Sequence, residues 1–154
     1  MADSDFTIYR DTREKRPYLF KGYPVDTEDI HMETADYAVK GDGEQTDGPF
    51  IPNFAVERKS KDDFLSSITH NRDRFERELG RASEWSLPIP VCIEAPEETL
   101  RGGDYRRDIH PNAVRGTIDS WRNQKPATFN FFDTRKTSEE FTFRLLRWHD
   151  RYHL

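Results

Sequence analysis

Residues 54–63, FAVERKSKDD, decide how this chain is interpreted. Three apolar residues, Phe54 to Val56, predict a strand that ends in Glu57, Arg58 and Lys59. Because side chains alternate between the faces of a strand, Glu57 and Lys59 share one face and Arg58 points to the other. An alternative explanation of these charged residues is that the strand simply ends in solvent. A carboxylate and an ammonium on one face, however, suit metal-assisted phosphodiester hydrolysis, in which the acid binds a hard cation and the lysine stabilises or activates the attacking group.

A helix follows the charged strand end directly. Ser60 with an acid three residues later, Asp63, is the pattern of a capped helix start, and apolar residues then recur at helical spacing over residues 61–68. Capping alone explains Asp63, although metal chemistry is the alternative. A second helix is predicted over residues 73–85, where alternating arginines and glutamates favour an exposed face of ion pairs four residues apart.

Two acids from other segments are expected to lie near the end of this strand. Asp11 follows a short β-rich stretch, and Asp36 lies where a strand over residues 30–40 is expected to bend. Glycines and prolines in residues 41–52 predict a long hairpin loop, which makes the strands on either side antiparallel neighbours. Asp36 should therefore lie close enough to Glu57 to share a metal ion.

The remaining elements complete an α/β pattern. Residues 21–29 are expected to be irregular, and Thr137 with Glu140 repeats the capping pattern at the start of a last helix. Further strands are predicted over residues 6–10, 89–94 and 128–132, and helices over residues 111–124 and 137–149. An antiparallel opening followed by strand–helix crossovers predicts a single domain, residues 1–154, with a central mixed β-sheet flanked by helices.

Composition excludes several classes of protein. The single cysteine, Cys92, excludes an internal disulfide and a multi-cysteine zinc site. Because no stretch has the apolar length of a membrane span and the first residues lack the apolar centre of a signal peptide, we expect a cytoplasmic protein. The net charge of −5 is not typical of nucleic-acid-binding proteins, yet 24 lysines and arginines are enough to form a local basic patch.

The acidic positions also carry a family resemblance. DTRE at residues 11–14, ADY at 35–37 and VERKSKDD at 56–63 resemble the motifs of the XPF (ERCC4-type) nuclease domain, and the likeness covers nearly the whole chain. It implies the PD-(D/E)XK restriction-endonuclease-like fold, in which Asp36 is the first acid, Glu57 the second and Lys59 the lysine. Ala35 stands where the family usually has glycine. No tandem helix–hairpin–helix module follows residue 154, so we expect a stand-alone nuclease similar to small bacterial, archaeal and viral ones.

The resemblance also implies roles for individual residues. Asp36 and Glu57 are expected to bind Mg²⁺ or Mn²⁺, and Asp11 to complete the acidic cluster directly or through water. Lys59 is expected to orient the attacking water or to neutralise charge on the phosphate.

Other residues are expected to support the site or to contact DNA. Arg58, on the opposite strand face, is expected to form a structural ion pair with Asp63 or a neighbouring acid. Arg72, at the start of the second helix, is the first candidate for a phosphate contact. The remaining candidates are Arg13 and His70 as DNA contacts and Glu14 as a supporting acid.

The implied function is that of a metal-dependent, structure-selective DNA endonuclease. Its expected substrate is branched or single-strand-containing DNA, in repair, recombination or viral DNA processing in a prokaryotic or viral host. The alternative is a non-catalytic DNA-binding or scaffold subunit, against which the retention of both acids and the lysine argues. A homodimer is also expected, because the last two helices carry more aromatic residues than a small core uses, namely Trp121, Phe141, Trp148 and Tyr152.

Overall fold

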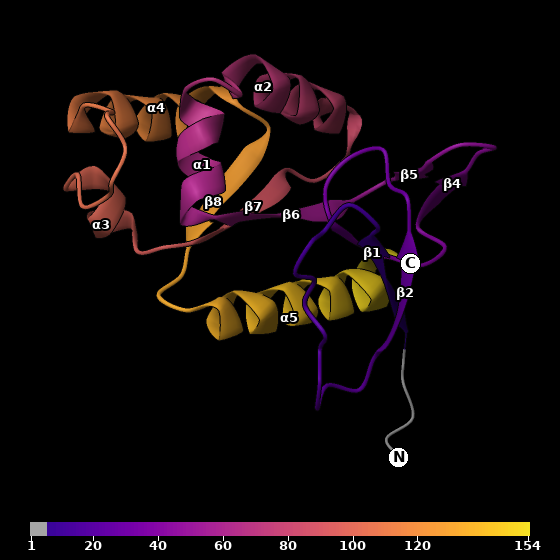
Figure 1. The fold of residues 1–154 in the computed structure, drawn as a ribbon. Helices are drawn as coiled ribbons and strands as arrows, with labels where there is room; N and C mark the ends of the chain where they lie inside the picture. Colours follow the sequence, from indigo (N-terminus) through magenta and orange to yellow (C-terminus); the bar gives the residue numbers. More distant parts are fainter. Residues whose placement is uncertain (1–5) are drawn as a thin grey trace.

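A six-stranded mixed β-sheet forms the centre of the computed structural model, which describes residues 6–154 (Figure 1). Its strands are β1 (Thr7–Asp11), β2 (Asp26–Ile30), β3 (Tyr37–Val39), β6 (Ala55–Ser60), β7 (Ile89–Glu94) and β8 (Ala127–Phe131). They lie in the order β2-β1-β3-β6-β7-β8. β3 is antiparallel to β1 and β6, and the other neighbours are parallel. All strands of this sheet except β3 therefore run in one direction.

Helices cover both faces of the sheet (Figure 1). α1 (Lys61–Ile68), α2 (Arg72–Arg81) and α4 (Pro111–Gln124) pack on one face, and α5 (Arg135–His153) packs on the other. A short helix, α3 (Glu97–Arg101), precedes α4. This arrangement confirms the predicted α/β fold class, a central mixed sheet flanked by helices.

The two hydrophobic cores show which way the side chains of β6 point. Ala55 packs in the core below α1, α2 and α4, whereas Phe54 and Val56 pack in the core against α5. Because side chains alternate along the strand, Glu57 and Lys59 point toward the α2 side and Arg58 toward the α5 side. The separation of these charges predicted from the sequence is therefore present in the fold.

The stretch that follows β6 folds as its sequence predicts. α1 occupies residues 61–68, and Ser60 Oγ accepts a hydrogen bond from the Asp63 N–H at 3.1 Å. α2 ends at Arg81 and is followed by a 3₁₀ turn over Ala82–Glu84, so the helix predicted over residues 73–85 finishes in a tighter turn. The cap fixes the end of β6 against the start of α1.

Two polar stretches form strands that an apolar pattern does not reveal. Residues 21–29, expected to be irregular, contribute to β2, which pairs in parallel with β1 at the edge of the sheet. The expected loop over residues 41–52 contains a separate hairpin of β4 (Gly43–Gln45) and β5 (Phe50–Pro52). The strand expected over residues 30–40 is reduced to β3. In β2 and β4, backbone pairing rather than side-chain burial creates the strand, which is why the periodicity misses them.

The last helix begins earlier than the sequence predicts. Thr134 Oγ1 accepts a hydrogen bond from the Thr137 N–H at 3.1 Å, so Thr134 is the cap and the prediction of Thr137 with Glu140 is wrong. Both threonines carry a hydroxyl that can cap a helix. Only a short turn separates β8 from α5, so the helix already begins after Thr134, and Thr137 lies inside its first turn. The helix also continues to His153 rather than ending near residue 149.

The aromatic residues expected at a dimer interface fall into two groups. Trp121 is 1% exposed and belongs to the core, and Phe141 is partly buried and packs against Phe132. Trp148 is 48% and Tyr152 75% exposed. These two rings stack with centroids 5.5 Å apart on α5. The homodimer stays a prediction, with Trp148 and Tyr152 as its remaining aromatic candidates. Within residues 6–154, no helix combines the length and apolar character needed to cross a bilayer.

Candidate active site

Strand ends gather the candidate residues at one edge of the sheet. β1 ends at Asp11, β6 carries Glu57 and Lys59 near its end, and Asp36 immediately precedes β3. Because β3 is antiparallel to both neighbours, its first residues lie at the same edge as the last residues of β1 and β6. The carboxyl ends of parallel strands commonly form the ligand sites of such sheets. Here a cleft of about 960 Å³ opens, and all four side chains line it.

Asp36 and Glu57 form the acid pair of the cleft. The pairing of Tyr37 with Val56 makes them neighbours across β3 and β6. The Arg58 backbone N–H donates to Asp36 Oδ2 at 2.7 Å, and the carboxyls of Asp36 and Glu57 are hydrogen-bonded to one another. Glu57 is only 6% exposed. The fold thus brings together two acids from separate segments of the chain, and Glu57 is the more deeply buried of the two.

Burial and crowding raise the pKa of both acids. Burial is the main reason that the pKa of Asp36 rises to about 7, and the charges of Glu14 and Glu78 add to the rise. Burial also raises the pKa of Glu57 well above its usual value, with a further contribution from the charges of Asp36 and Glu78 and an opposing one from Lys59. A cation between two such carboxyls relieves both the burial and the repulsion.

Lys59 brings a positive charge to the acid pair. Its Nζ lies 3.8 Å from Glu57 Oε2 and 4.3 Å from the centre of the Phe75 ring in α2. The side chain is 13% exposed. The carboxylate and the aromatic face hold the ammonium in place, so a phosphate that enters above the acids meets a positioned positive charge.

The acid pair suits a hard cation that keeps much of its water. Within residues 6–154, no three histidine, cysteine or carboxylate side chains are arranged to hold a metal ion by themselves. Mg²⁺ is commonly bound by one or two carboxylates and completes its shell with water and substrate phosphate oxygens. The crowded, hydrogen-bonded carboxyls of Asp36 and Glu57 fit that requirement, because a cation can replace the proton between them.

Asp11 lines the cleft, but its carboxylate is already engaged. Oδ1 accepts a hydrogen bond from the Met32 N–H at 3.0 Å, and Oδ2 accepts one from Arg13 Nε at 2.7 Å. The side chain is nearly inaccessible, at 3% exposed. The Asp11 backbone N–H also donates to the Asp36 carbonyl oxygen at 2.8 Å. These bonds fix the chain that leads into Asp36, and direct metal binding by Asp11 stays a prediction.

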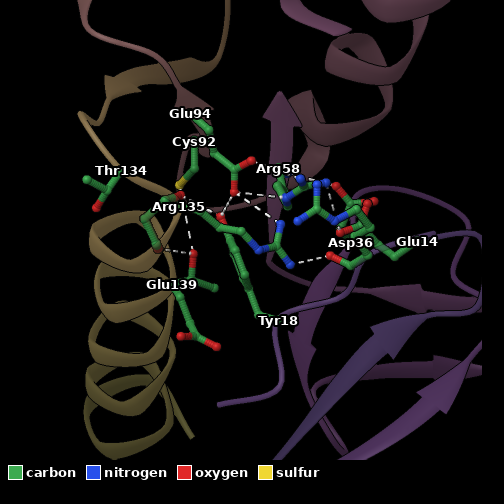
Figure 2. A network of polar contacts seen from close by, with 12 residues as sticks. Glu14, Tyr18, Asp36, Arg58, Cys92, Glu94, Thr134, Arg135 and Glu139 are labelled. Atoms are coloured by element: carbon green, nitrogen blue, oxygen red, sulfur yellow. Dashed lines mark hydrogen bonds and ion pairs between the residues drawn. The ribbon is translucent and has the colours of Figure 1, made fainter. Parts of the chain in front are cut away.

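On the opposite face of β6, Arg58 joins a buried ion-pair network (Figure 2). Its Nε and Nη2 donate to the two oxygens of Glu94 at 3.0 and 2.8 Å, and its Nη1 lies 3.6 Å from Glu14 Oε2. The side chains of Arg58 and Glu94 are each 10% exposed. The structural ion pair expected of Arg58 therefore exists, with Glu94 and Glu14 as its acids. Asp63 is not a partner, because it stands at the start of α1 and lines the cleft instead.

The same network ties distant parts of the chain to the back of the site. Tyr18, in the segment after β1, donates its hydroxyl to Glu94 at 2.7 Å, and Arg135 of α5 lies 3.4 Å from the same carboxylate. The Tyr37 hydroxyl donates to Glu14 at 2.8 Å. Burial raises the pKa of Glu14, while the nearby Arg58 opposes that rise. Glu14 thus lies in the network behind the site, and its supporting role stays a prediction.

The predicted DNA contacts do not all reach the cleft. Arg13 lines it. Arg72 turns toward α4, where Nη1 donates to Thr117 Oγ1 at 3.0 Å and the guanidinium lies 5.2 Å from the centre of the Trp121 ring. His70 is exposed but is not among the residues of the cleft. Arg72 therefore packs against α4 outside the cleft. The phosphate contacts expected of Arg72 and His70 stay predictions.

One face of α2 lines the cleft, and this was not predicted from the sequence. Ion pairs four residues apart were expected along this helix, but in the described part of the chain only Arg72 and Glu76 form one, at 3.4 Å. Four other charged residues of the helix line the cleft instead. Their spacing of three, four and seven residues marks one helix face and was the available signal. These cleft-lining residues are Arg74, Arg77, Glu78 and Arg81.

Two of these side chains hold the turn that presents Asp36. The Ala35 N–H donates to Glu78 Oε2 at 3.2 Å, and Arg81 Nε donates to Thr34 Oγ1 at 2.9 Å. Ala35 has a φ of 68°, in the left-handed region that residues with a Cβ avoid. The helix therefore secures a strained turn directly before the first acid.

Replacing Ala35 with glycine is expected to stabilise the protein by about 0.5–1 kcal/mol, because glycine adopts a positive φ without the steric cost. Thermal unfolding should show a Tm about 1–4 °C higher. The control is Ala38→Gly in β3, a buried position in an extended strand, which should lower the Tm. If Ala35→Gly lowers the Tm as Ala38→Gly does, the turn is not strained.

Comparisons with known proteins agree with this fold. The ERCC4 domain family matches residues 10–145, whereas no curated protein matches the sequence. Two solved structures of XPF from Aeropyrum pernix, the second a complex with DNA, are similar to this chain with TM-scores of 0.68 and 0.67, each at 18% identity. The matches cover 92% and 95% of this chain but 65% and 66% of theirs, so it spans less than two thirds of their length. At this identity the likeness shows a shared fold. Because the family match takes in most of its residues, the chain belongs to the ERCC4 domain family.

Proposed function

We propose that this protein is a metal-dependent DNA endonuclease that hydrolyses phosphodiester bonds. The observation that carries the proposal is the placement of Asp36, Glu57 and Lys59 together in one cleft at the edge of the sheet. Membership of the ERCC4 domain family, a family of DNA nucleases, supports it. So does the fold shared with XPF from Aeropyrum pernix, one structure of which is a complex with DNA.

Asp36 and Glu57 are the proposed ligands of Mg²⁺ or Mn²⁺. When bound, the cation supplies Lewis-acid polarisation of a phosphate oxygen and helps to generate a nucleophilic water. Both carboxyls must lose their protons to bind it, and their raised pKa values make that binding tighter as the pH rises. Asp11 orders the chain before Asp36 through its hydrogen bonds.

Lys59 is the proposed electrophilic residue. Its ammonium stands beside Glu57, where negative charge grows on the phosphate as the attacking oxygen approaches. The Phe75 ring and the Glu57 carboxylate limit the positions that the ammonium can take. Lys59 thereby stabilises the transition state and orients the attacking water by a hydrogen bond.

The proposed substrate is DNA with a single-stranded portion, such as a fork, flap or bubble. Because Glu57 is 6% exposed and lies inside the cleft, the scissile phosphate must enter the cleft to meet it. An unpaired strand bends into such a space more readily than a duplex does. Action on branched DNA in repair, recombination or viral DNA processing, and pairing into a homodimer, belong to the same proposal and rest on the family resemblance.

A cleavage panel tests the proposal. Purified protein is incubated with end-labelled forks, flaps, bubbles, single strands and duplexes in Mg²⁺ or Mn²⁺, with parallel reactions in EDTA. We expect products from the substrates that contain single strands, in either metal, and none in EDTA. Absence of cleavage of every substrate in both metals, or equal cleavage in EDTA, contradicts the proposal.

A further inference from the structure

Two arginines of α2 line the cleft without a partner. Arg74 and Arg77 are exposed, and neither side chain forms an ion pair, a hydrogen bond or a ring contact with any other residue in 6–154. Their neighbours on the same helix face, Glu78 and Arg81, are engaged with the turn before Asp36. The α2 wall of the cleft therefore carries two cations that the fold does not use. Because the chain as a whole has a net charge of −5, unpaired cations beside an acidic site indicate a surface that binds an anion.

A second group of cations lies in the segment after β1. Lys15 and Arg16 are exposed and line the same cleft, and within residues 6–154 neither side chain has a charged partner. The third cation of this segment, Arg13, is engaged with Asp11. Every exposed charged residue that lines the cleft is therefore a cation except Asp63, whereas Asp36 and Glu57 are less exposed.

Contacts with β6 place the two basic groups on opposite sides of the acid pair. Lys59 contacts Phe75, which connects α2 to one face of β6. Arg58 points to the other face and pairs with Glu14, which belongs to the segment that carries Lys15 and Arg16. The end of β6, which carries Glu57, thus lies between the two basic groups.

We propose that Arg74 and Arg77 bind backbone phosphates of the DNA strand beside the scissile one, and that Lys15 and Arg16 bind the strand on the other side. This inference rests on the proposed function and extends it by giving the strand a path across the end of β6, from one basic group to the other. Residues three apart on a helix are separated by about 4.5 Å along its axis. Two guanidinium groups at that spacing, on long side chains, can reach successive phosphates, and arginine binds phosphate oxygens through paired N–H groups.

Salt-dependent binding of a single strand tests this inference. A fluorescent oligothymidylate is titrated with protein in Mg²⁺ at several salt concentrations, in a Glu57→Gln background that prevents cleavage. We expect Arg74→Ala/Arg77→Ala to raise Kd about tenfold or more at moderate salt. The slope of log K against log salt should fall by about 1.4, which is about 0.7 for each lost phosphate contact on a single strand.

The matched control is Arg106→Ala/Lys136→Ala, which removes the same charge from exposed residues outside the cleft. It should leave both Kd and the salt slope close to those of the parent. Arg74→Lys/Arg77→Lys should restore most of the slope, because lysine keeps the charge. If the alanine pair in α2 behaves like the control while the wild-type chain still cleaves DNA, the inference is overturned and the proposed function stands. A wild-type chain that neither binds nor cleaves any DNA overturns both.

Discussion

Glu57→Gln is expected to give a protein that is more stable than the wild type and inactive. Glutamine keeps the size of the side chain and a hydrogen bond to Asp36 but removes one of two crowded, buried acids. In EDTA at pH 8 the stability should rise by about 1–3 kcal/mol, the usual cost of burying a polar group without a compensating partner. Cleavage in Mg²⁺ should fall by at least about 10²–10³-fold, because a ligand of the metal is lost. Thermal unfolding and a cleavage assay measure the two effects.

The stability gain of Glu57→Gln should depend on pH. Burial raises the pKa of Glu57 well above its ordinary value of 4.5, so the folded protein holds this proton more tightly than the unfolded chain does. Below about pH 4 both states are protonated and there is no penalty; as the pH rises toward 7 the unfolded chain ionises first and folding becomes less favourable. Asp36, whose pKa rises to about 7, adds a trend in the same direction to the wild type and the variant alike.

The variant should therefore gain most above pH 7 and little near pH 4. The control is Glu44→Gln, the same chemical change at an exposed residue of β4, which should not alter stability at either pH. Equal stability of Glu57→Gln and the wild type at pH 8 contradicts the burial and crowding of the two acids.

Arg58→Ala is expected to destabilise the protein by about 3–5 kcal/mol, because it leaves Glu94 and Glu14 buried without their shared cation. The Tm should fall by about 6–20 °C in a chain of this size. Loss of the guanidinium also loosens the strand that carries Glu57 and Lys59, so activity should decline in proportion to the loss of folded protein. Urea unfolding with a parallel activity measurement gives both values.

An exposed ion pair provides the control for Arg58. Arg107 pairs with Asp62 at 3.0 Å, but the Asp62 side chain is 76% exposed, so Arg107→Ala should cost less than about 1 kcal/mol. A stability loss as small for Arg58→Ala as for Arg107→Ala excludes a structural role for the network. The family resemblance places Arg58 inside the nuclease motif, whereas the geometry places its side chain behind the site, and this comparison separates the two roles.

The centre of the site could be predicted from the sequence because strand alternation and helix capping, which depend only on nearby residues, determine it. Alternation along β6 separates Arg58 from Glu57 and Lys59, and the Ser60 cap fixes where α1 begins. Both depend on neighbours in the chain. The antiparallel pairing expected across residues 41–52 places Asp36 beside Glu57, although the segment between them forms its own pair of strands.

The remainder of the site depends on tertiary contacts that the chain order does not specify. Arg72 and Arg74 are equally basic and nearly adjacent, but one faces Trp121 and the other faces the cleft. The choice is set by how α2 sits between α4 and the sheet. The partner of Arg58 is likewise set by β7, since Glu94 ends the strand paired with β6, while Asp63 is closer in sequence but stands on α1.

Metal-dependent cleavage of a labelled DNA fork by wild type, Glu57→Gln and Lys59→Met tests the central claim most directly. We expect products from the wild type in Mg²⁺ or Mn²⁺, none in EDTA, and a loss of about 10²–10³-fold or more in each variant with folding intact. Cleavage by either variant at the wild-type rate, or by the wild type in EDTA, would show that the cleft formed by Asp36, Glu57 and Lys59 is not the site of phosphodiester hydrolysis.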